Sequence, residues 1–366
     1  MDSTALRWRG FMLDEARHFF GKDAVKALME RMAAHGLNVF HWHLTDDQGW
    51  RIDLPGMPEL ARFGATRRSS PIPGGGDESS DGKRYGPFSY TVGDIREIVA
   101  FASGLGIDVV PEIDLPGHSR ALLAAHPEFS CAGESLIREP LCAFGICEDV
   151  LCAGNDEAID YCGRVLEAVC DLFPSKFVHI GGDECPTARW EACPKCRARM
   201  RKEGFSDVAP LQGFLARRFI DILARRGRRA VVWNELLKRG DIPASAVVQV
   251  WCGDAAADAT AAVQKGHDVI LSPMLDTYFS IPEGIPGDPY HYRAWVVKHG
   301  WTLPASRVRA FDPFALVSPG LSGRLLGAEC CAWTESIHDR AELEYKVLNR
   351  LAAFGDAMAV AHPTNH

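Results

Sequence analysis

Short runs rich in β-branched and apolar residues alternate with longer helical patterns along almost the whole chain. This alternation predicts βα units, in which a helix follows each strand and the strands lie parallel. Eight strand-like runs are present, at residues 10–13, 37–44, 107–113, 177–181, 230–233, 247–251, 268–271 and 325–333. The helical patterns include residues 24–35, 92–105, 157–172, 210–226, 255–265 and 340–353.

Eight strands with a closing helix are the set that forms a (β/α)8 barrel, the TIM-barrel form of the α/β class. An open doubly wound sheet would carry a glycine-rich phosphate turn after its first strand, whereas the glycines at 74–76 stand in a polar loop. We therefore predict one barrel over residues 1–366. Two long irregular segments, 66–90 and 272–322, are expected to be loops over the mouth of the barrel, where this fold binds substrates.

The charge balance and hydropathy limit the partners of the chain. Its net charge is -8 and its pI is about 5.9. Binding to nucleic acid needs clustered Lys and Arg in excess, so no nucleic-acid partner is expected. The sequence has neither an apolar run long enough to span a bilayer nor an apolar stretch typical of a signal peptide at its start. We expect no membrane partner and a cytoplasmic location.

Twelve cysteines are scattered through helix and strand patterns, and a chain of this size needs no disulfide framework, so we expect free thiols. Cys185, Cys193 and Cys196 are the exception in spacing and could supply three zinc ligands. A structural zinc site needs a fourth ligand, which the sequence leaves open, with Cys152 or a more distant cysteine as candidates. We predict no metal and no cofactor, with this zinc set as the alternative.

Polar and aromatic side chains stand at the carboxyl ends of the predicted strands, which meet at one mouth in a barrel. They include Arg9, Asp14, His41, His43, Asp46, Asp47, Glu112, Asp114, His118, Asp183, Glu184, Trp233, Glu235, Trp251, Trp333 and Glu335. No serine elbow and no zinc-binding His-Glu-x-x-His pattern accompanies them. Aromatic faces pack on sugar rings, and pairs of carboxyl groups cleave glycosidic bonds. The sequence therefore predicts a sugar-binding mouth.

Several of these residues also have a purely structural interpretation. Trp42 could be only a core residue, and Glu112 and Asp114 could be ion-pair partners of barrel arginines. His41 and His43, two apart on a strand without a third ligand, are typical of packed and hydrogen-bonded side chains rather than of a metal site. Their coincidence at strand ends favours a functional site.

Five blocks carry a resemblance to a known family. They are residues 9–14, 41–50, 111–118, 179–184 (His-Ile-Gly-Gly-Asp-Glu) and 333–335. In this order they resemble the signature blocks of glycoside hydrolase family 20, the β-N-acetylhexosaminidases, and the resemblance runs from Arg9 to about Phe354. It implies a retaining exo-β-N-acetylhexosaminidase that removes terminal, non-reducing β-linked GlcNAc or GalNAc. It also implies substrate-assisted catalysis, in which the 2-acetamido oxygen attacks the anomeric carbon and forms an oxazolinium ion.

The resemblance implies a role for each site residue. Glu184 would be the general acid and base, which requires a raised pKa, and Asp183 would hold the acetamide N–H and balance its charge. Asp46, preferred over Asp47, and His118 would orient Glu184. The substrate-binding residues would be Trp233, Trp251 and Trp333 as an aromatic cage, Tyr278 as a donor to the acetamide oxygen, and Arg9 and Glu335 on the outer hydroxyls.

The chain also departs from the family pattern. Many members carry a small α/β domain before the barrel, and because this sequence starts at the first strand we expect a single catalytic domain without it. The region 289–322 is unfamiliar, with Tyr290, Tyr292, Trp295 and Trp301 as candidate walls for the leaving sugar. The family allows a homodimer. Two alternatives stay open: release of a disaccharide, as by a lacto-N-biosidase, and a non-catalytic glycan-binding barrel, which the intact pair Asp183 and Glu184 argues against.

Overall fold

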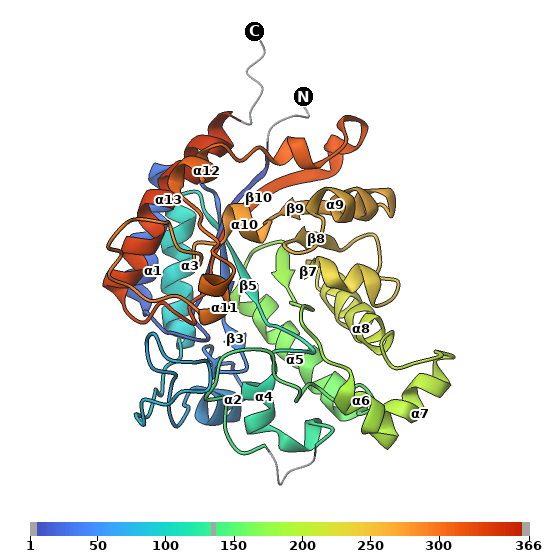
Figure 1. The fold of residues 1–366 in the computed structure, drawn as a ribbon. Helices are drawn as coiled ribbons and strands as arrows, with labels where there is room; N and C mark the ends of the chain where they lie inside the picture. The colour runs from blue at the N-terminus through green and yellow to red at the C-terminus, as the bar shows by residue number, and fades with distance from the viewer. Residues whose placement is uncertain (1–5, 133–136, 361–366) are drawn as a thin grey trace.

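The computed structural model describes residues 6–132 and 137–360, and these residues build a closed barrel of parallel strands (Figure 1). Around the barrel the strands follow the order β1-β10-β9-β8-β7-β6-β5-β2, so neighbours in sequence are neighbours in space. The barrel strands are β1 (Trp8–Asp14), β2 (Val39–His43), β5 (Asp108–Glu112), β6 (Phe177–His179), β7 (Arg229–Trp233), β8 (Val247–Val250), β9 (Asp268–Leu271) and β10 (Leu325–Ala332).

Helices surround this barrel, with α1, α3 and α13 on one side of Figure 1 and α8 and α9 on the other. The α-helices are α1 (Lys22–Ala34), α2 (Pro58–Gly64), α3 (Val92–Gly104), α4 (Arg120–Ala125), α5 (Asp156–Leu172), α6 (Ala188–Ala192), α7 (Pro194–Lys202), α8 (Leu211–Arg225), α9 (Ala255–Gln264), α10 (Met274–Thr277), α11 (Ala294–Lys298), α12 (Ala305–Arg309) and α13 (Arg340–Val360). Short 3-10 helices are η1 (Pro127–Phe129), η2 (Asn234–Lys238), η3 (Pro313–Leu316) and η4 (Pro319–Arg324).

The predicted barrel is confirmed, and the ends of all eight strands lie within two residues of the predicted ones. Five of the six predicted helices agree to the same extent, while α13 continues to Val360 because its last turns bury Phe354, Ala357 and Met358. A small hairpin of β3 (Thr45–Asp46) and β4 (Gly49–Trp50) was not predicted, since its strands are too short to show a period.

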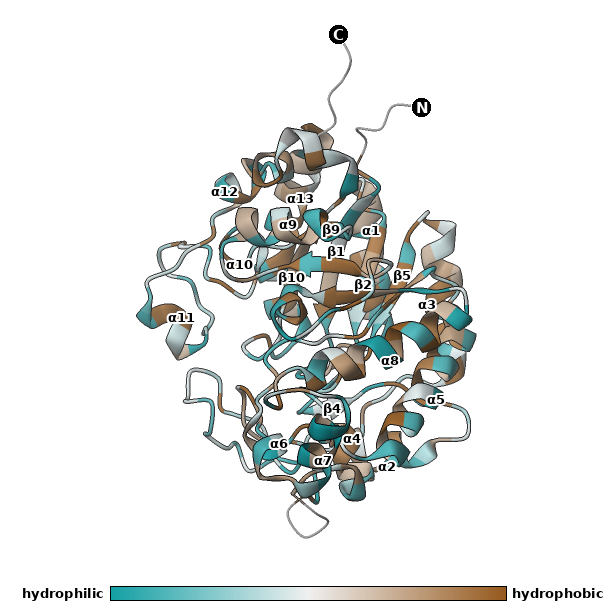
Figure 2. Ribbon diagram, turned by 90° about the vertical axis from the view of Figure 1, so that its right-hand side faces the viewer, coloured by the Kyte–Doolittle hydropathy of each residue, from teal (hydrophilic) through white to brown (hydrophobic). Residues whose placement is uncertain are grey.

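Local signals in the sequence explain why the outer helices form. In α5, buried residues recur every three or four positions, which gives one apolar face against the barrel. The side chain of Asn155 caps this helix by accepting hydrogen bonds from the backbone N–H groups of Glu157 and Ala158. Thr91 and Asp94 form a capping box at the start of α3. In Figure 2 the strands β1, β2 and β5 are largely hydrophobic, whereas the outer helices α3, α5 and α8 carry both hydrophobic and hydrophilic residues.

The interior of the barrel is layered. At the amino ends of the strands a separate apolar cluster fills the barrel: Trp8, Val39, Val110, Val231, Val247, Ile270 and Leu326. Above it lie buried polar side chains, His41, Glu112, His179, Gln249 and Glu329. Trp42 points the other way, into the surrounding core, where its indole packs on Tyr90. An apolar layer thus fills the amino end of the barrel, and the buried polar side chains lie between this layer and the carboxyl ends of the strands.

Within residues 6–132 and 137–360, none of the helices combines the length and the apolar character needed to cross a bilayer.

Candidate active site

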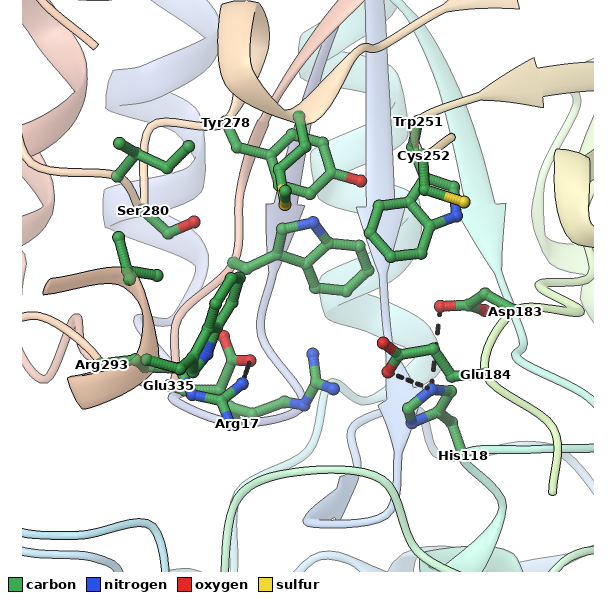
Figure 3. Close-up of a pocket in the computed structure, with 15 residues that line it drawn as sticks. Arg17, His118, Asp183, Glu184, Trp251, Cys252, Tyr278, Ser280, Arg293 and Glu335 are labelled. Carbon is green, nitrogen blue, oxygen red and sulfur yellow. Dashed lines mark hydrogen bonds and ion pairs between the residues drawn. The ribbon is translucent and has the colours of Figure 1, made fainter. Parts of the chain in front are cut away.

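The segment that follows β6 turns sharply into the mouth of the barrel. Gly181 and Gly182 have φ values of 65° and 95°, which glycine adopts without strain. A Cβ on Gly181 would lie 1.7 Å from Oδ1 of Asp114, and the same oxygen accepts a hydrogen bond of 3.1 Å from the N–H of Gly182. Glu184 also has a positive φ, 41°. This turn places Asp183 and Glu184 side by side at the mouth (Figure 3).

His118 connects these two carboxyl groups to a second pair. Its Nε2 lies 3.7 Å from Oδ2 of Asp183 and 3.6 Å from Oε2 of Glu184. Its Nδ1 lies 3.3 Å from Oδ1 of Asp46 and 3.3 Å from Oδ2 of Asp47. Like Glu184, His118 has a positive φ, 46°, so the backbone is held in a costly conformation at both residues. The imidazole is therefore fixed between two carboxylate pairs.

Burial and neighbouring charges have opposing effects on the pKa values in this cluster. Burial, together with the nearby carboxyl group of Asp114, raises the pKa of Asp183 well above its usual value. Burial alone would lower the pKa of His118, but the charges of Asp46 and Asp183 outweigh it and raise this pKa well above normal. For Glu184, burial acts to raise the pKa, but the hydrogen bond and charge of His118 lower it below normal. This differs from the raised pKa that we expected for a general acid.

A cavity of about 340 Å³ lies beside Asp183 and Glu184. It is lined by Arg17, His118, Asp183, Glu184, Trp251, Cys252, Met274, Tyr278, Ser280, Ile281, Arg293, Trp295, Val296, Trp333 and Glu335. Seven of the ten predicted site residues therefore line one cavity: Asp183, Glu184, His118, Trp251, Tyr278, Trp333 and Glu335. They come from loops after five different strands, as the barrel mouth predicts.

Aromatic side chains form one wall of this cavity. The rings of Trp251 and Tyr278 are stacked, with centroids 6.1 Å apart and an interplanar angle of 7°, and Trp333 lies 6.2 Å from Tyr278. The ring of Trp233 lies 6.1 Å from Trp333. Trp233 is itself completely buried, and its indole N–H donates to Glu112, so it supports Trp333 from behind and does not line the cavity.

Glu235 links this wall to the carboxyl pair. Its Oε2 accepts a hydrogen bond of 3.1 Å from the indole N–H of Trp251, and its Oε1 accepts one of 3.2 Å from the backbone N–H of Glu184. The sequence places Glu235 at a strand end but gives it no role. In the structure it fixes both the aromatic wall and the segment that carries Glu184.

Two arginines and a carboxylate close the opposite side of the cavity. Nη2 of Arg17 lies 2.8 Å from Oδ2 of Asp46, and its Nη1 lies 3.1 Å from Oδ2 of Asp14. The central carbon of its guanidinium lies 5.2 Å from the ring centroid of Trp333. Arg293 forms an ion pair of 2.9 Å with Glu335 (Figure 3). Neither arginine was predicted from the sequence as a site residue. Arg17 offered one signal, its spacing of three residues after Asp14 at the end of β1, but Arg293 comes from the unfamiliar segment 289–322.

The prediction that Arg9 holds the substrate is wrong. Arg9 stands at the start of β1, at the amino end of the barrel, where its Nε donates to the carbonyl of Gly36 at 2.7 Å and its Nη1 to that of Leu6 at 2.8 Å. Arg17 occupies the cavity instead. Arg9 lies near the amino end of β1, whereas side chains reach the mouth of a barrel from the carboxyl ends of its strands.

Two further predictions are refined by the structure. Asp46 does not line the cavity but lies behind His118, and Asp47 is equally close to the imidazole. Despite burial, the charges of Arg17 and His118 lower the pKa of Asp46, whereas burial raises the pKa of Asp47, so Asp46 ionises more readily than Asp47. Among the candidate walls in segment 289–322, Trp295 lines the cavity, whereas Tyr290 and Tyr292 do not. The ring of Tyr292 faces Nζ of Lys346, and the ring of Tyr290 packs on that of Tyr345.

Of the cysteines considered for zinc, Cys193, Cys196 and the candidate fourth ligand Cys152 come together, whereas Cys185 does not. Cys185 lies apart, with its Sγ near the carbonyl of Pro186. Cys193 and Cys196 instead gather with Cys131 and Cys152, and the four Sγ atoms all lie within 4.8 Å of one another. Spacing along the chain could not show that all four cysteines meet, because Cys131 and Cys152 are about forty to sixty residues away from Cys193 and Cys196.

Comparison with known proteins gives consistent matches over nearly the whole chain. The model of the glycosyl hydrolase family 20 catalytic domain matches residues 6–359. A β-hexosaminidase of Porphyromonas gingivalis is 36% identical over 97% of this chain and 43% of its own length. A β-hexosaminidase of Vibrio furnissii is also 36% identical, over 96% of this chain and 56% of its own length. The chain thus spans about half the length of these curated relatives.

Solved structures give the same result. A crystal structure of a β-N-acetylhexosaminidase superimposes with a TM-score of 0.83 at 30% identity, covering 96% of this chain and 71% of that one. The exo-β-N-acetylglucosaminidase of Vibrio harveyi, solved with N-acetylglucosamine, superimposes with a TM-score of 0.82 at 32% identity, covering 96% and 54%.

Proposed function

Because the chain belongs to glycosyl hydrolase family 20, we propose that it is a retaining exo-β-N-acetylhexosaminidase that removes terminal, non-reducing β-linked GlcNAc or GalNAc. The observation that carries this proposal is the placement of Asp183 and Glu184, adjacent in sequence, at one end of an aromatic-walled cavity. Its substrate is a glycan or glycoconjugate that ends in such a sugar.

The adjacency of the two carboxyl groups supports a nucleophile supplied by the substrate. In ordinary retaining enzymes the acid and the nucleophile flank the glycosidic bond, about 5 Å apart on opposite sides. Asp183 and Glu184 instead both face the same imidazole nitrogen of His118. With one carboxyl group as the acid, its neighbour is poorly placed to reach the anomeric carbon. The 2-acetamido oxygen of the sugar can reach that carbon from within the substrate.

The reaction then proceeds in two steps. In the first, the acetamido oxygen bonds to the anomeric carbon while the bond to the leaving oxygen breaks, and Glu184 gives its proton to that oxygen. The ring so formed is an oxazolinium ion, whose positive charge and N–H are held by Asp183. In the second step, Glu184 takes a proton from water, which attacks the anomeric carbon and reopens the ring. Two inversions leave the β configuration unchanged.

Binding of the sugar also shifts the pKa values of both carboxyl groups. The low pKa of Glu184 and the high pKa of Asp183 favour an ionised Glu184 and a neutral Asp183, the reverse of what the first step requires. A sugar in the cavity removes water from the partly exposed Glu184, which raises its pKa. The acetamide N–H donates to Asp183, which lowers its pKa. Both effects move the proton to Glu184.

The rest of the cavity provides positioning. The ring faces of Trp251 and Trp333 enclose the acetamide, and the buried hydroxyl of Tyr278, whose pKa burial raises well above normal, stays protonated and donates to the acetamide oxygen. At the other end, Arg17 and Glu335 bind the outer hydroxyls. The Arg293–Glu335 ion pair closes this end behind one sugar, which favours release of a monosaccharide over release of a disaccharide.

The test compares two variants on nitrophenyl β-GlcNAc and on an unactivated β-GlcNAc disaccharide. Nitrophenolate leaves with little help from an acid, so Glu184→Gln should lower the rate far more on the disaccharide, by roughly 10²–10⁴-fold. Asp183→Asn should lower both rates by about 10²–10³-fold, since it acts on the acetamide. Nitrophenyl β-glucoside, which lacks the acetamide, and nitrophenyl lacto-N-bioside should not be cleaved.

Glu30→Gln, on the exposed face of α1, is the matched control and should behave as the wild type. Cleavage of the β-glucoside, or full activity of both active-site variants, would contradict the proposal. Cleavage of the lacto-N-bioside alone would identify a disaccharide-releasing enzyme.

A further inference from the structure

We propose that Cys131, Cys152, Cys193 and Cys196 bind one zinc ion, in a structural site separate from the active-site cavity. All four Sγ atoms lie within 4.8 Å of one another. The Sγ of Cys196 is 3.6 Å from that of Cys131 and 3.6 Å from that of Cys152, and Cys152 and Cys193 are 3.8 Å apart. None of these cysteines lines the cavity described above.

These distances match the geometry of a tetrahedral zinc site. With Zn–S bonds of about 2.3 Å, the edges of a sulfur tetrahedron are about 3.8 Å long. A disulfide would instead need an S–S distance of about 2.05 Å, and all four cysteines are free. Four thiolates around one centre are the soft donor set that selects zinc over the hard cations Mg²⁺ and Ca²⁺.

The backbone presents the four ligands in two pairs. Cys131 and Cys152 each directly follow one partner of the antiparallel bridge between Ser130 and Leu151. Cys193 and Cys196 flank the start of α7, in the Cys-x-x-Cys spacing that zinc sites use. Gly154 lets the two pairs meet, because a Cβ there would lie 2.2 Å from the carbonyl carbon of Lys195.

Burial and charge suit a metal with four thiolates. Cys152, Cys193 and Cys196 are buried, with 1%, 7% and 0% exposure. A zinc ion with four thiolates carries a net charge of about two negative units, because each thiolate contributes one negative charge. The pair Cys193 and Cys196 lies at the amino end of α7, the end that stabilises negative charge, and α7 itself is rich in Lys and Arg.

The site would join the two loops that carry the catalytic cluster. Cys131 and Cys152 belong to the long segment between β5 and α5, which also supplies His118, and α7 follows the segment that carries Asp183 and Glu184. The same two segments already share a hydrogen bond of 2.9 Å from the indole of Trp190 to the carbonyl of Leu151 and an ion pair between Arg189 and Asp149. A metal at this junction would hold the mouth together without touching substrate.

The test measures metal in the whole chain, produced with zinc in the medium and purified under reducing conditions. Elemental analysis should find one zinc per chain, and mercurial titration of the thiols should release it to a colorimetric chelator. Cys152→Ser and Cys196→Ser should lose the zinc and melt at lower temperature. Cys185→Ser and Cys170→Ser, which alter buried cysteines outside the cluster, should keep it.

A second measurement protects the test against variants that fail to fold. Wild-type chain produced with cobalt should show the intense visible absorption of tetrahedral cobalt bound by thiolates, and zinc should abolish this absorption. The proposal is overturned if the wild type holds no zinc and its four thiols react freely, if mass spectrometry finds disulfides among them, if iron occupies the site, or if Cys185→Ser loses the metal as Cys152→Ser does.

Discussion

Burial, Asp114 and the charge of His118 shift the pKa values of the neighbouring Asp183 and Glu184 in opposite directions. The imidazole lies about equally far from Asp183 and Glu184, at 3.7 and 3.6 Å. Asp183 is additionally buried beside Asp114, which raises its pKa, whereas Glu184 is more exposed and responds mainly to His118. The pKa values of two neighbouring carboxyl groups beside one imidazole are therefore shifted in opposite directions, because burial and Asp114 outweigh His118 only at Asp183. The difference between their environments is what allows them to take different roles.

Arg9 lies in β1 and Arg17 lies in the loop that follows β1, so the two arginines form a matched pair for mutation. Arg17 lines the cavity and pairs with Asp46, so Arg17→Gln should lower kcat/KM on nitrophenyl β-GlcNAc by about 100-fold through misplacement of the sugar. Arg9 binds only backbone carbonyls at the amino end of the barrel, so Arg9→Gln should keep kcat/KM within about twofold. Steady-state kinetics of the two variants measures this difference in kcat/KM. Equal losses in both variants would show that Arg17 does not bind the substrate.

At the scale of elements, the turn after β6 determines whether Asp183 and Glu184 meet His118. Gly181 and Gly227 have nearly the same φ, 65° and 68°, but a Cβ would collide with Asp114 only at Gly181, while Gly227 is open. Gly227→Ala should therefore cost only about 1 kcal/mol of stability and no activity. Gly181→Ala should displace Asp114 and lower kcat/KM by at least about 100-fold.

Thermal melting and kinetics of the two glycine variants test this prediction together. An active Gly181→Ala with the stability of Gly227→Ala would show that the contact with Asp114 does not position the turn.

The elements that could be predicted from the sequence are those with a long or regular pattern. The strands are continuous apolar runs because both of their faces are buried, and the amphipathic period marks α5 and α8. The hairpin of β3 and β4 and the short helices α10, α11 and α12 have too few residues to show a period.

For the site, motifs placed Asp183, Glu184, His118 and the aromatic wall. Motifs could not place Arg17, whose position depends on contacts with Asp14 and Asp46 from two different loops. The sequence offered Cys152 as a candidate ligand beside Cys193 and Cys196 but did not identify Cys131, because that contact exists only after the loops fold together.

At the scale of the whole molecule, a buried charged network crosses the barrel beneath the active site. His41 lies 2.7 Å from Glu329 and 3.1 Å from Glu112, and His43 and His179 also contact Glu112. Burial would lower the pKa of His43, but the charge of Glu112 and hydrogen bonds to Asp46 and Glu112 raise it to about 10. The network joins four strands of the barrel, so it couples folding to pH.

The sign of this coupling follows from the raised pKa. His43 gains a proton more easily when folded than when unfolded, so its contribution is complete below about pH 6.5 and is lost as the pH rises through about 10. His43→Gln should lower the free energy of unfolding by about 3–5 kcal/mol near pH 6, because it removes one of the three histidines that contact the buried Glu112. The difference from the wild type should shrink toward pH 10.

Urea unfolding across this pH range measures the effect. His267→Gln is the control, because burial lowers the pKa of His267, so its difference from the wild type should stay constant between about pH 8 and 10. A constant difference for His43→Gln over the same range would contradict a charged His43.

We propose that the substrate's own acetamide is the nucleophile beside Asp183 and Glu184. The most direct measurement is the rate of cleavage of nitrophenyl β-GlcNAc substrates whose 2-acetamido methyl group carries successively more fluorine atoms. Fluorine withdraws electrons from the carbonyl oxygen and makes it a weaker nucleophile, so kcat should fall steeply with each substitution. Rates that do not depend on fluorination would show that a protein group, and not the acetamide, attacks the anomeric carbon.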